Sequence, residues 1–309
     1  MLSPGRFRVL AGLTALFAYV QIVLGGLVRV SGSGLGCPDW PTCYGRPYPP
    51  ADLHAVIEYS HRTVGAFTGL LIIATLLAAF WIYRRRRSAV TWMAVATLAA
   101  VVAEGLLGWR VVASLLNPSL VQIHLAIGLL VLGLLLSQAL LAVPPVAPRP
   151  AASLGLLSGA ATALTFLMLL TGSSVVASGA DKVCKSWPLC GGGFALDLSN
   201  PAFFGVSHRL VVLAVSLLLV YWLVLVLRRQ ASRPGAALVA GLTLLALTAQ
   251  VAVGAAAAVT NEVAAVQGLH VALAAAVWAG VVSLTLLLLR PVAATLDVAP
   301  ALAFEGRPA

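Results

Sequence analysis

Charged residues are scarce in this chain. Asp, Glu, Lys and Arg make up 9% of its 309 residues while 61% are hydrophobic, so too little polar surface exists to cover a water-soluble domain of this size. Acidic residues are especially rare, nine against 19 basic ones. The composition therefore excludes a soluble enzyme or binding module and indicates an integral membrane protein.

Eight runs that are almost free of charge are long enough to cross a hydrocarbon core of about 30 Å as helices. They cover residues 9–28, 63–83, 88–109, 119–143, 151–177, 210–227, 236–260 and 263–289. The first run has the flanks of a signal peptide, but it is longer than the usual apolar region and leads into a repeated motif. We expect it to be retained, which predicts an all-α membrane protein with eight spans.

The formal net charge is +10, yet the basic residues do not form a nucleic-acid-binding patch. Most fall on one side of the membrane if the spans alternate, as topology requires. The run Arg84–Arg87 is interpreted as a topology anchor on that side. By the positive-inside rule both termini are cytoplasmic, and the expected surroundings are the lipid bilayer, without a nucleic-acid partner.

Histidine and cysteine are also few, five and four, but nearly all of them belong to an internal repeat. The proline-rich segment 143–150 separates two blocks of four spans, which predicts a first half at residues 1–147 and a second half at 148–309. Four spans per half predict two four-helix bundles in the same orientation, related by a pseudo-twofold axis. The repeated elements are Ser60-His61-Arg62 with Ser207-His208-Arg209, Cys37-x5-Cys43 with Cys184-x5-Cys190, and His124 with His270.

The four repeated histidines fall near the outer ends of the second, fourth, sixth and eighth spans. Two helices of one bundle that present histidines at one depth can bind a porphyrin iron from opposite faces. This predicts a haem site from His61 and His124 and another from His208 and His270. A hydrogen-bonded helix-end role or a mononuclear zinc or copper site is the alternative. His54 has no counterpart and is interpreted as a loop residue.

The repeat breaks at one acid. Glu58 precedes His61 by three residues, whereas the aligned position in the second half is Gly205. A carboxylate in only one half predicts that this half performs a reaction and the other holds a permanent cofactor. Glu58 is the candidate for proton transfer or for stabilising a cationic intermediate, against the alternative of a solvated helix-start acid.

Three further charged residues belong to the predicted sites. Arg62 and Arg209 follow histidines at the membrane surface, where a guanidinium is expected to bind a haem propionate; an ordinary interfacial arginine is the alternative. Glu104 lies inside the third span, where a charge is costly and must be neutralised or paired. Its aligned residue is the neutral Gln250.

The loops 31–59 and 178–204 carry all four cysteines and are expected on the outer face, where disulfides persist in bacteria. The predicted pairs are Cys37–Cys43 and Cys184–Cys190. The second pair is expected to be structural, and the first, above the reactive half, is a candidate redox pair. A four-cysteine zinc site built from both loops is the alternative.

Three segments closely resemble the bacterial haem A synthase family: Gln21-x2-Leu24-Gly25-Gly26-x2-Arg29, the block from Ser33 through Gly36-Cys37-Pro38-Asp39-Trp40-Pro41 to Gly45, and Glu58-x2-His61-Arg62. The resemblance covers essentially the whole chain. It implies an oxidoreductase of the bacterial cytoplasmic membrane that converts the C8 methyl group of haem O to the formyl group of haem A, through hydroxymethyl intermediates (haem I).

The resemblance also implies roles for the site residues. His61 and His124 would hold haem O with Glu58 essential beside it, and His208 and His270 would ligate a resident haem b. The implied partners are haem O synthase, the assembly of haem-copper terminal oxidases, and an electron acceptor or donor that the sequence does not identify.

This sequence departs from the family pattern in two places. Lys185-Ser186 replaces the Pro-Asp of the first loop, and Glu104 stands where glutamine is expected. The main alternative function is a di-haem b electron carrier that oxidises a quinol and modifies no haem; a haem transporter ranks last.

Overall fold

The computed structural model describes residues 3–83, 88–142, 152–191, 193, 197–260 and 263–289. Within these ranges it contains only helices as regular structure: α1 (Pro4–Val30), α2 (Leu53–Tyr83), α3 (Ala89–Ala113), α4 (Pro118–Leu141), α5 (Ala152–Ala177), α6 (Ala180–Val183), α7 (Ala202–Arg229), α8 (Ala236–Val259) and α9 (Ala264–Leu289). All except the short α6 are long and apolar enough to cross a membrane. The predicted all-α fold with eight spans is therefore confirmed.

Two helices begin at least eight residues earlier than predicted. α2 begins at Leu53 instead of residue 63, and α7 begins at Ala202 instead of residue 210. The predicted runs stopped at charged residues, but those charges are paired with the loops above the helices, so the helices continue past them. His61 and His208 therefore lie within helices, and His54, predicted in a loop, is the second residue of α2.

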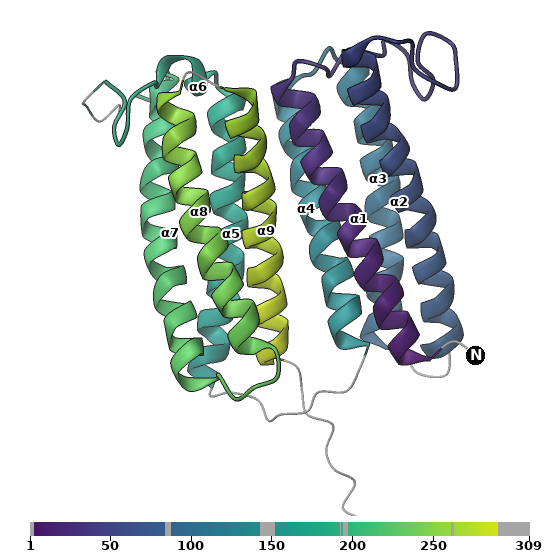
Figure 1. The fold of residues 1–309 in the computed structure, drawn as a ribbon, viewed down its shortest axis with the longest axis vertical. Helices are drawn as coiled ribbons and strands as arrows, with labels where there is room; N and C mark the ends of the chain where they lie inside the picture. The colour runs from purple at the N-terminus through teal and green to yellow at the C-terminus, as the bar shows by residue number, and fades with distance from the viewer. Residues whose placement is uncertain are drawn as a thin grey trace, which may run out of the picture.

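The helices form two four-helix bundles that stand side by side (Figure 1), one made of α1 to α4 and the other of α5, α7, α8 and α9. The first cysteine loop (residues 31–52) and the second cysteine loop (residues 178–201, with α6) lie at the same end. This arrangement follows from the even number of spans in each half. The predicted boundary between residues 147 and 148 and the Arg84–Arg87 run lie outside the described residues.

The two bundles meet along α1 and α4 on one side and α5 and α9 on the other. Trp278 of α9 packs in an apolar cluster with residues of α1, α2 and α4, and its indole N–H donates to the carbonyl oxygen of Leu129 at 2.8 Å. The Tyr19 hydroxyl donates to the carbonyl oxygen of Ala272 at 3.1 Å. Because α9 contributes to the core of the first bundle, the two bundles form one packed unit.

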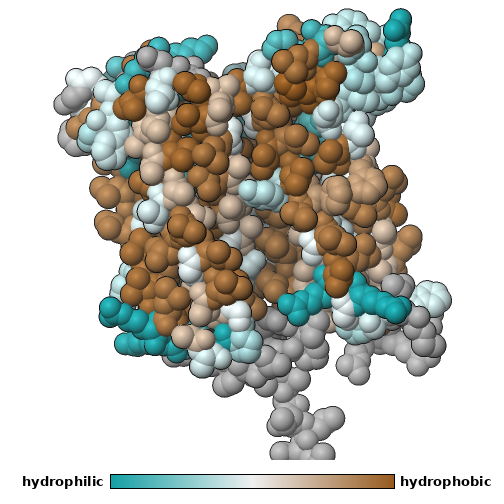
Figure 2. Space-filling model, in the orientation of Figure 1, coloured by the Kyte–Doolittle hydropathy of each residue, from teal (hydrophilic) through white to brown (hydrophobic). Residues whose placement is uncertain are grey.

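Apolar side chains cover the middle of the face shown in Figure 2, and polar side chains gather at its two ends. Large hydrophobic side chains point outward from several spans; Leu70, Trp81 and Leu245 are 64%, 66% and 68% exposed. A soluble monomer rarely exposes so much contiguous apolar surface. The surface of the helices is thus suited to lipid hydrocarbon.

Candidate functional site

Each of the four repeated histidines packs against a glycine of a neighbouring helix. A methyl group added to these glycines would lie 2.7–3.4 Å from the Cε1 atom of the facing histidine. The pairs are Gly25 with His61, Gly108 with His124, Gly172 with His208, and Gly254 with His270. Each glycine precedes its histidine by 36 or 16 residues, in the same order in both halves. The glycines set how close each imidazole lies to the next helix. The repeated separation of 36 and 16 residues between glycine and histidine is the signal in the sequence by which these glycines could have been recognised.

His61 and His124 face each other across the first bundle from α2 and α4. Their ring centroids are 6.5 Å apart, with 77° between the ring planes. A metal ion that binds two imidazoles lies about 2 Å from each ligand nitrogen, and each nitrogen lies about 1 Å from the centre of its ring. Two rings on opposite sides of the metal therefore need roughly 6 Å between their centres. The pair therefore fits an iron porphyrin ligated from both faces. His208 and His270 lie on the equivalent helices α7 and α9.

The cysteines are paired with each other and are not free to bind a metal. Cys37 is bonded to Cys43, and Cys184 to Cys190, as predicted. Among the described residues no group of three or more His, Cys, Asp or Glu side chains is placed to hold a metal ion. The four-cysteine zinc alternative is therefore wrong, and the histidine pairs are the donor set that suits haem.

In the first half, the two histidines have different partners. Nε2 of His61 lies 3.3 Å from the side-chain nitrogen of Gln21. Nδ1 of His124 lies 2.9 Å from Oε2 of Glu104, at ion-pair distance. Glu104, which the sequence required to be neutral or paired, thus has a partner, and that partner is a predicted haem ligand.

In the second half, the histidine on the earlier helix has its partner at Nδ1 and the histidine on the later helix has its partner at Nε2, the reverse of the first half. Nδ1 of His208 lies 2.9 Å from the Thr171 hydroxyl, and Nε2 of His270 lies 3.4 Å from the side-chain nitrogen of Gln250. Gln250 is aligned with Glu104 but approaches the opposite nitrogen. Sequence reasoning assigned Thr171 no role, because its aligned residue in the first half is Leu24 and carries no polar group.

Glu58 lies on the second turn of α2, is 3% exposed, and points its carboxylate at the first cysteine loop. Its Oε2 accepts a hydrogen bond from the backbone N–H of Cys37 at 2.8 Å, and its Oε1 is ion-paired with Arg62. Arg62 also donates to the carbonyl oxygens of Cys37, Asp39 and Thr42 at 3.0, 2.5 and 2.8 Å. Glu58 and Arg62 together hold the loop on the start of α2.

The second cysteine loop is held without an acid. Arg209 donates to the carbonyl oxygens of Cys184, Ser186 and Pro188 at 2.6–3.1 Å. At Gly205, the position aligned with Glu58, a methyl group would lie 2.9 Å from the sulfur of Cys184. The disulfide therefore packs where the first half has a carboxylate.

These bonds compete with the predicted propionate contacts of Arg62 and Arg209. Both terminal nitrogens of each guanidinium donate to loop carbonyl oxygens. Residue types do not reveal such acceptors, because every residue has a carbonyl group. The structure thus gives both arginines a loop-holding role, and the propionate contacts stay a prediction.

Asp39 organises the tip of the first cysteine loop. Its carboxylate accepts hydrogen bonds from the Thr42 hydroxyl and from the backbone N–H groups of Tyr44 and Gly45. These donors favour the ionised form and hold the pKa of Asp39 below its ordinary value. In the second loop the aligned Ser186 accepts from a backbone N–H through a neutral hydroxyl, so only the first loop depends on a charge here.

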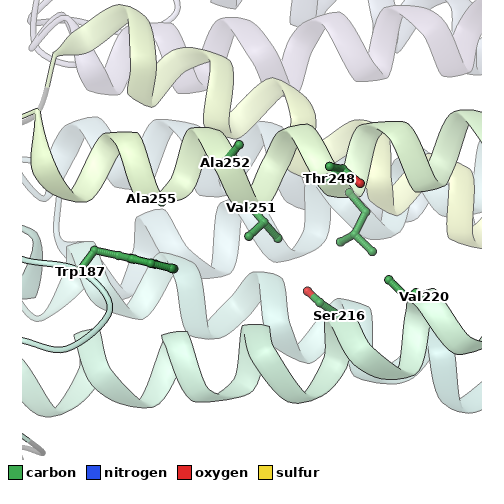
Figure 3. A pocket seen from close by; sticks show the side chains of 8 residues that line it. Trp187, Ser216, Val220, Thr248, Val251, Ala252 and Ala255 are labelled. Carbon is green, nitrogen blue, oxygen red and sulfur yellow. The ribbon is translucent and has the colours of Figure 1, made fainter.

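A cavity of about 390 Å³ lies between α7 and α8, with Trp187 of the second cysteine loop at one end (Figure 3). Ser216 and Val251 line it, and the buried Ser216 hydroxyl oxygen lacks a hydrogen-bond partner. The aligned residues in the first half are Gly69 and Gly105, where a methyl group would meet nothing within 4 Å. At these two positions the first half therefore lacks the side chains that Ser216 and Val251 supply in the second half.

The model of a family described as cytochrome oxidase assembly protein matches residues 8–282. This chain belongs to that family. The match runs from α1 into α9, so it includes both histidine pairs and both disulfides. A family relative named heme A synthase, from Symbiobacterium thermophilum, is 33% identical over 257 residues, which are 76% of this chain and 80% of the relative.

Two further relatives carry the same name. The protein from Halalkalibacterium halodurans is 29% identical over 235 residues, which are 72% of this chain and 76% of the relative. The protein from Shouchella clausii is 27% identical over 274 residues, which are 84% of this chain and 89% of the relative. The similarity thus extends along most of the length of each protein.

Proposed function

We propose that this protein is a haem A synthase. It oxidises the C8 methyl group of haem O to the formyl group of haem A, through hydroxymethyl intermediates, for the assembly of haem-copper terminal oxidases. One observation carries the proposal: a histidine pair with the 6.5 Å spacing that suits an axially ligated iron lies in the half that also contains the buried Glu58. The family and the names of the relatives agree with it.

We assign the substrate haem O to His61 and His124 in the first half, residues 1–147. The second half, residues 148–309, holds a resident haem b between His208 and His270, which supplies one-electron redox chemistry when bound. Haem O carries a long isoprenoid chain that haem b lacks. The absence of side chains at Gly69 and Gly105, where the second half has Ser216 and Val251, agrees with placing the bulkier haem in the first half.

Glu58 is the proposed catalytic residue. With water as the source of oxygen, oxidation of a methyl group to a formyl group (–CH3 + H2O → –CHO + 4 H+ + 4 e−) passes four electrons to the unidentified acceptor and releases four protons, so a group that accepts protons or stabilises a cationic carbon is required. The Cys37 N–H and Arg62 hold the two oxygen atoms of Glu58 in place. The first cysteine loop, fixed by the same contacts, lies at this end of the bundle.

The proposed location is the bacterial cytoplasmic membrane, with both termini in the cytoplasm and both cysteine loops on the outer face. The position of both loops at one end of the molecule supports this orientation, as does the persistence of disulfides outside the cytoplasm. Haem O synthase is the proposed source of substrate, and haem-copper oxidase assembly uses the product.

Co-expression with a haem O synthase in cells that lack haem A tests the function. Membrane haems are extracted and separated by reversed-phase chromatography with mass detection, with a Glu58→Gln variant as the matched control. Haem A or its hydroxymethyl precursor in the parent, reduced in the variant, supports the proposal. If only haems B and O appear while the purified protein carries haem, a di-haem b electron carrier that oxidises quinol replaces it.

A further inference from the structure

The contact between Glu104 and His124 distinguishes one histidine from the other three. It joins Oε2 to Nδ1 at 2.9 Å, and neither buried atom has another partner. Glu104 comes from α3 and reaches His124 on α4 beside Gly108, which lies one turn further along α3. Among the contacts that the four haem-site histidines make, this is the one with a carboxylate.

A partner at one imidazole nitrogen decides how well the other nitrogen binds a metal. A carboxylate at Nδ1 fixes the tautomer and the ring orientation, and it makes Nε2 a stronger donor to the metal. His124 has this arrangement. In His61 the held nitrogen is Nε2, which lies against the Gln21 amide, while Nδ1 is buried without a partner. His61 must give up its amide contact, or turn its ring, before Nε2 can bind iron. His270 makes the same contact with Gln250, so the two halves differ at Nδ1 of the opposite histidine, which meets the Glu104 carboxylate in the first half and the Thr171 hydroxyl in the second.

We propose that Glu104 is a positioning residue that makes His124 the firmly held axial ligand of the first-half haem and leaves His61 as the exchangeable one. This inference rests on the proposed function, because it requires haem in the first half. An iron with two permanent histidine ligands has no position for a small molecule. An exchangeable His61 gives the reactive haem such a position.

The repeat supplies a matched pair of variants. Glu104→Gln gives the first half the residue of the second, and Gln250→Glu gives the second half the residue of the first. The full-length protein is purified with haem, and each haem is titrated potentiometrically. Glu104→Gln is expected to lower the preference of the first-half site for ferric over ferrous haem about tenfold, which raises its midpoint potential by about 59 mV. Gln250→Glu places its carboxylate against Nε2 of His270 and not against Nδ1, so it is expected to compete with iron for that nitrogen and to lower the haem content of the second half.

Ligand variants test the exchange. We expect His124→Ala to weaken haem binding in the first half at least tenfold more than His61→Ala does. We also expect the reduced His61→Ala protein to bind carbon monoxide at once, in the amount of one haem. Two results would overturn the inference. One is an equal loss of haem in the two variants; the other is a Glu104→Gln protein in which the preference of the first-half site for ferric haem changes less than about twofold.

The same set of proteins separates this inference from the proposed function. If a His61→Ala/His124→Ala double variant carries as much haem as the parent, the first half holds no haem and the proposed function falls as well. If the double variant loses one haem while Glu104→Gln leaves the potential unchanged, only the role of Glu104 falls. Should Glu104→Gln fail to fold, the ligand variants decide, because equal losses of haem from His124→Ala and His61→Ala overturn the inference.

Discussion

Replacement of Glu58 by glutamine is expected to loosen the first cysteine loop. The Glu58 side chain is 4% exposed and that of its partner Arg62 is 11% exposed, so the variant leaves a guanidinium largely buried without its counter-ion. Breaking such a buried pair costs about 3–5 kcal/mol. Arg62 keeps three carbonyl acceptors, which places the expected loss at the lower limit, about 3 kcal/mol.

Amide hydrogen exchange measures this loss directly. A change of about 3 kcal/mol raises the opening equilibrium constant roughly 100-fold, so the Cys37 amide, which donates to Glu58, should exchange about 100-fold faster in purified full-length protein. The second cysteine loop serves as the internal control, because Gly205 replaces the acid there. Exchange at Cys37 that rises less than about threefold while haem A formation is lost would refute the clamp and leave Glu58 a purely chemical role.

Three further predictions concern the sites. Gly254→Ala places a methyl group 2.7 Å from Cε1 of His270 and should lower the haem content of the second half about tenfold. The haem content is measured as the pyridine haemochrome, and Gly12→Ala, whose methyl group would meet nothing within 4 Å, should leave it unchanged. Because the pKa of Asp39 is below its ordinary value, the stability it contributes is present above that value and is lost as pH falls through its folded pKa. Limited pepsin digestion should show this acid-induced opening at the tip of the first loop, and Asp39→Asn should abolish the pH dependence at that tip. Gly105→Val should weaken binding of haem O to the first half about tenfold while sparing haem b in the second half; unchanged binding of haem O would contradict the placement of its isoprenoid chain beside Gly105.

Some of the site could be predicted because residue type alone limits it. A histidine in an apolar span has few roles other than ligand binding or proton transfer, and its return in the second half excludes coincidence. Glu58 could be singled out because it is not repeated: its counterpart in the second half is the glycine Gly205. The contacts of Arg62 and Arg209 could not be predicted, because their acceptors are backbone oxygens whose position depends on how each loop folds.

The sequence by itself determined the eight spans, the duplicated four-helix halves, the paired histidines and the cysteine pairs. The length of an apolar run decides whether it can cross a bilayer, and cysteines six residues apart on one loop are near each other in almost any fold. Only the tertiary structure decided that Glu104 touches His124, that glycines seat all four imidazoles, and that Glu58 holds a loop. These contacts join different helices, or a helix and a loop, and depend on how each segment is rotated and how closely it packs. The packing of all the side chains together fixes the rotation of each segment, so the sequence of one segment alone does not determine it.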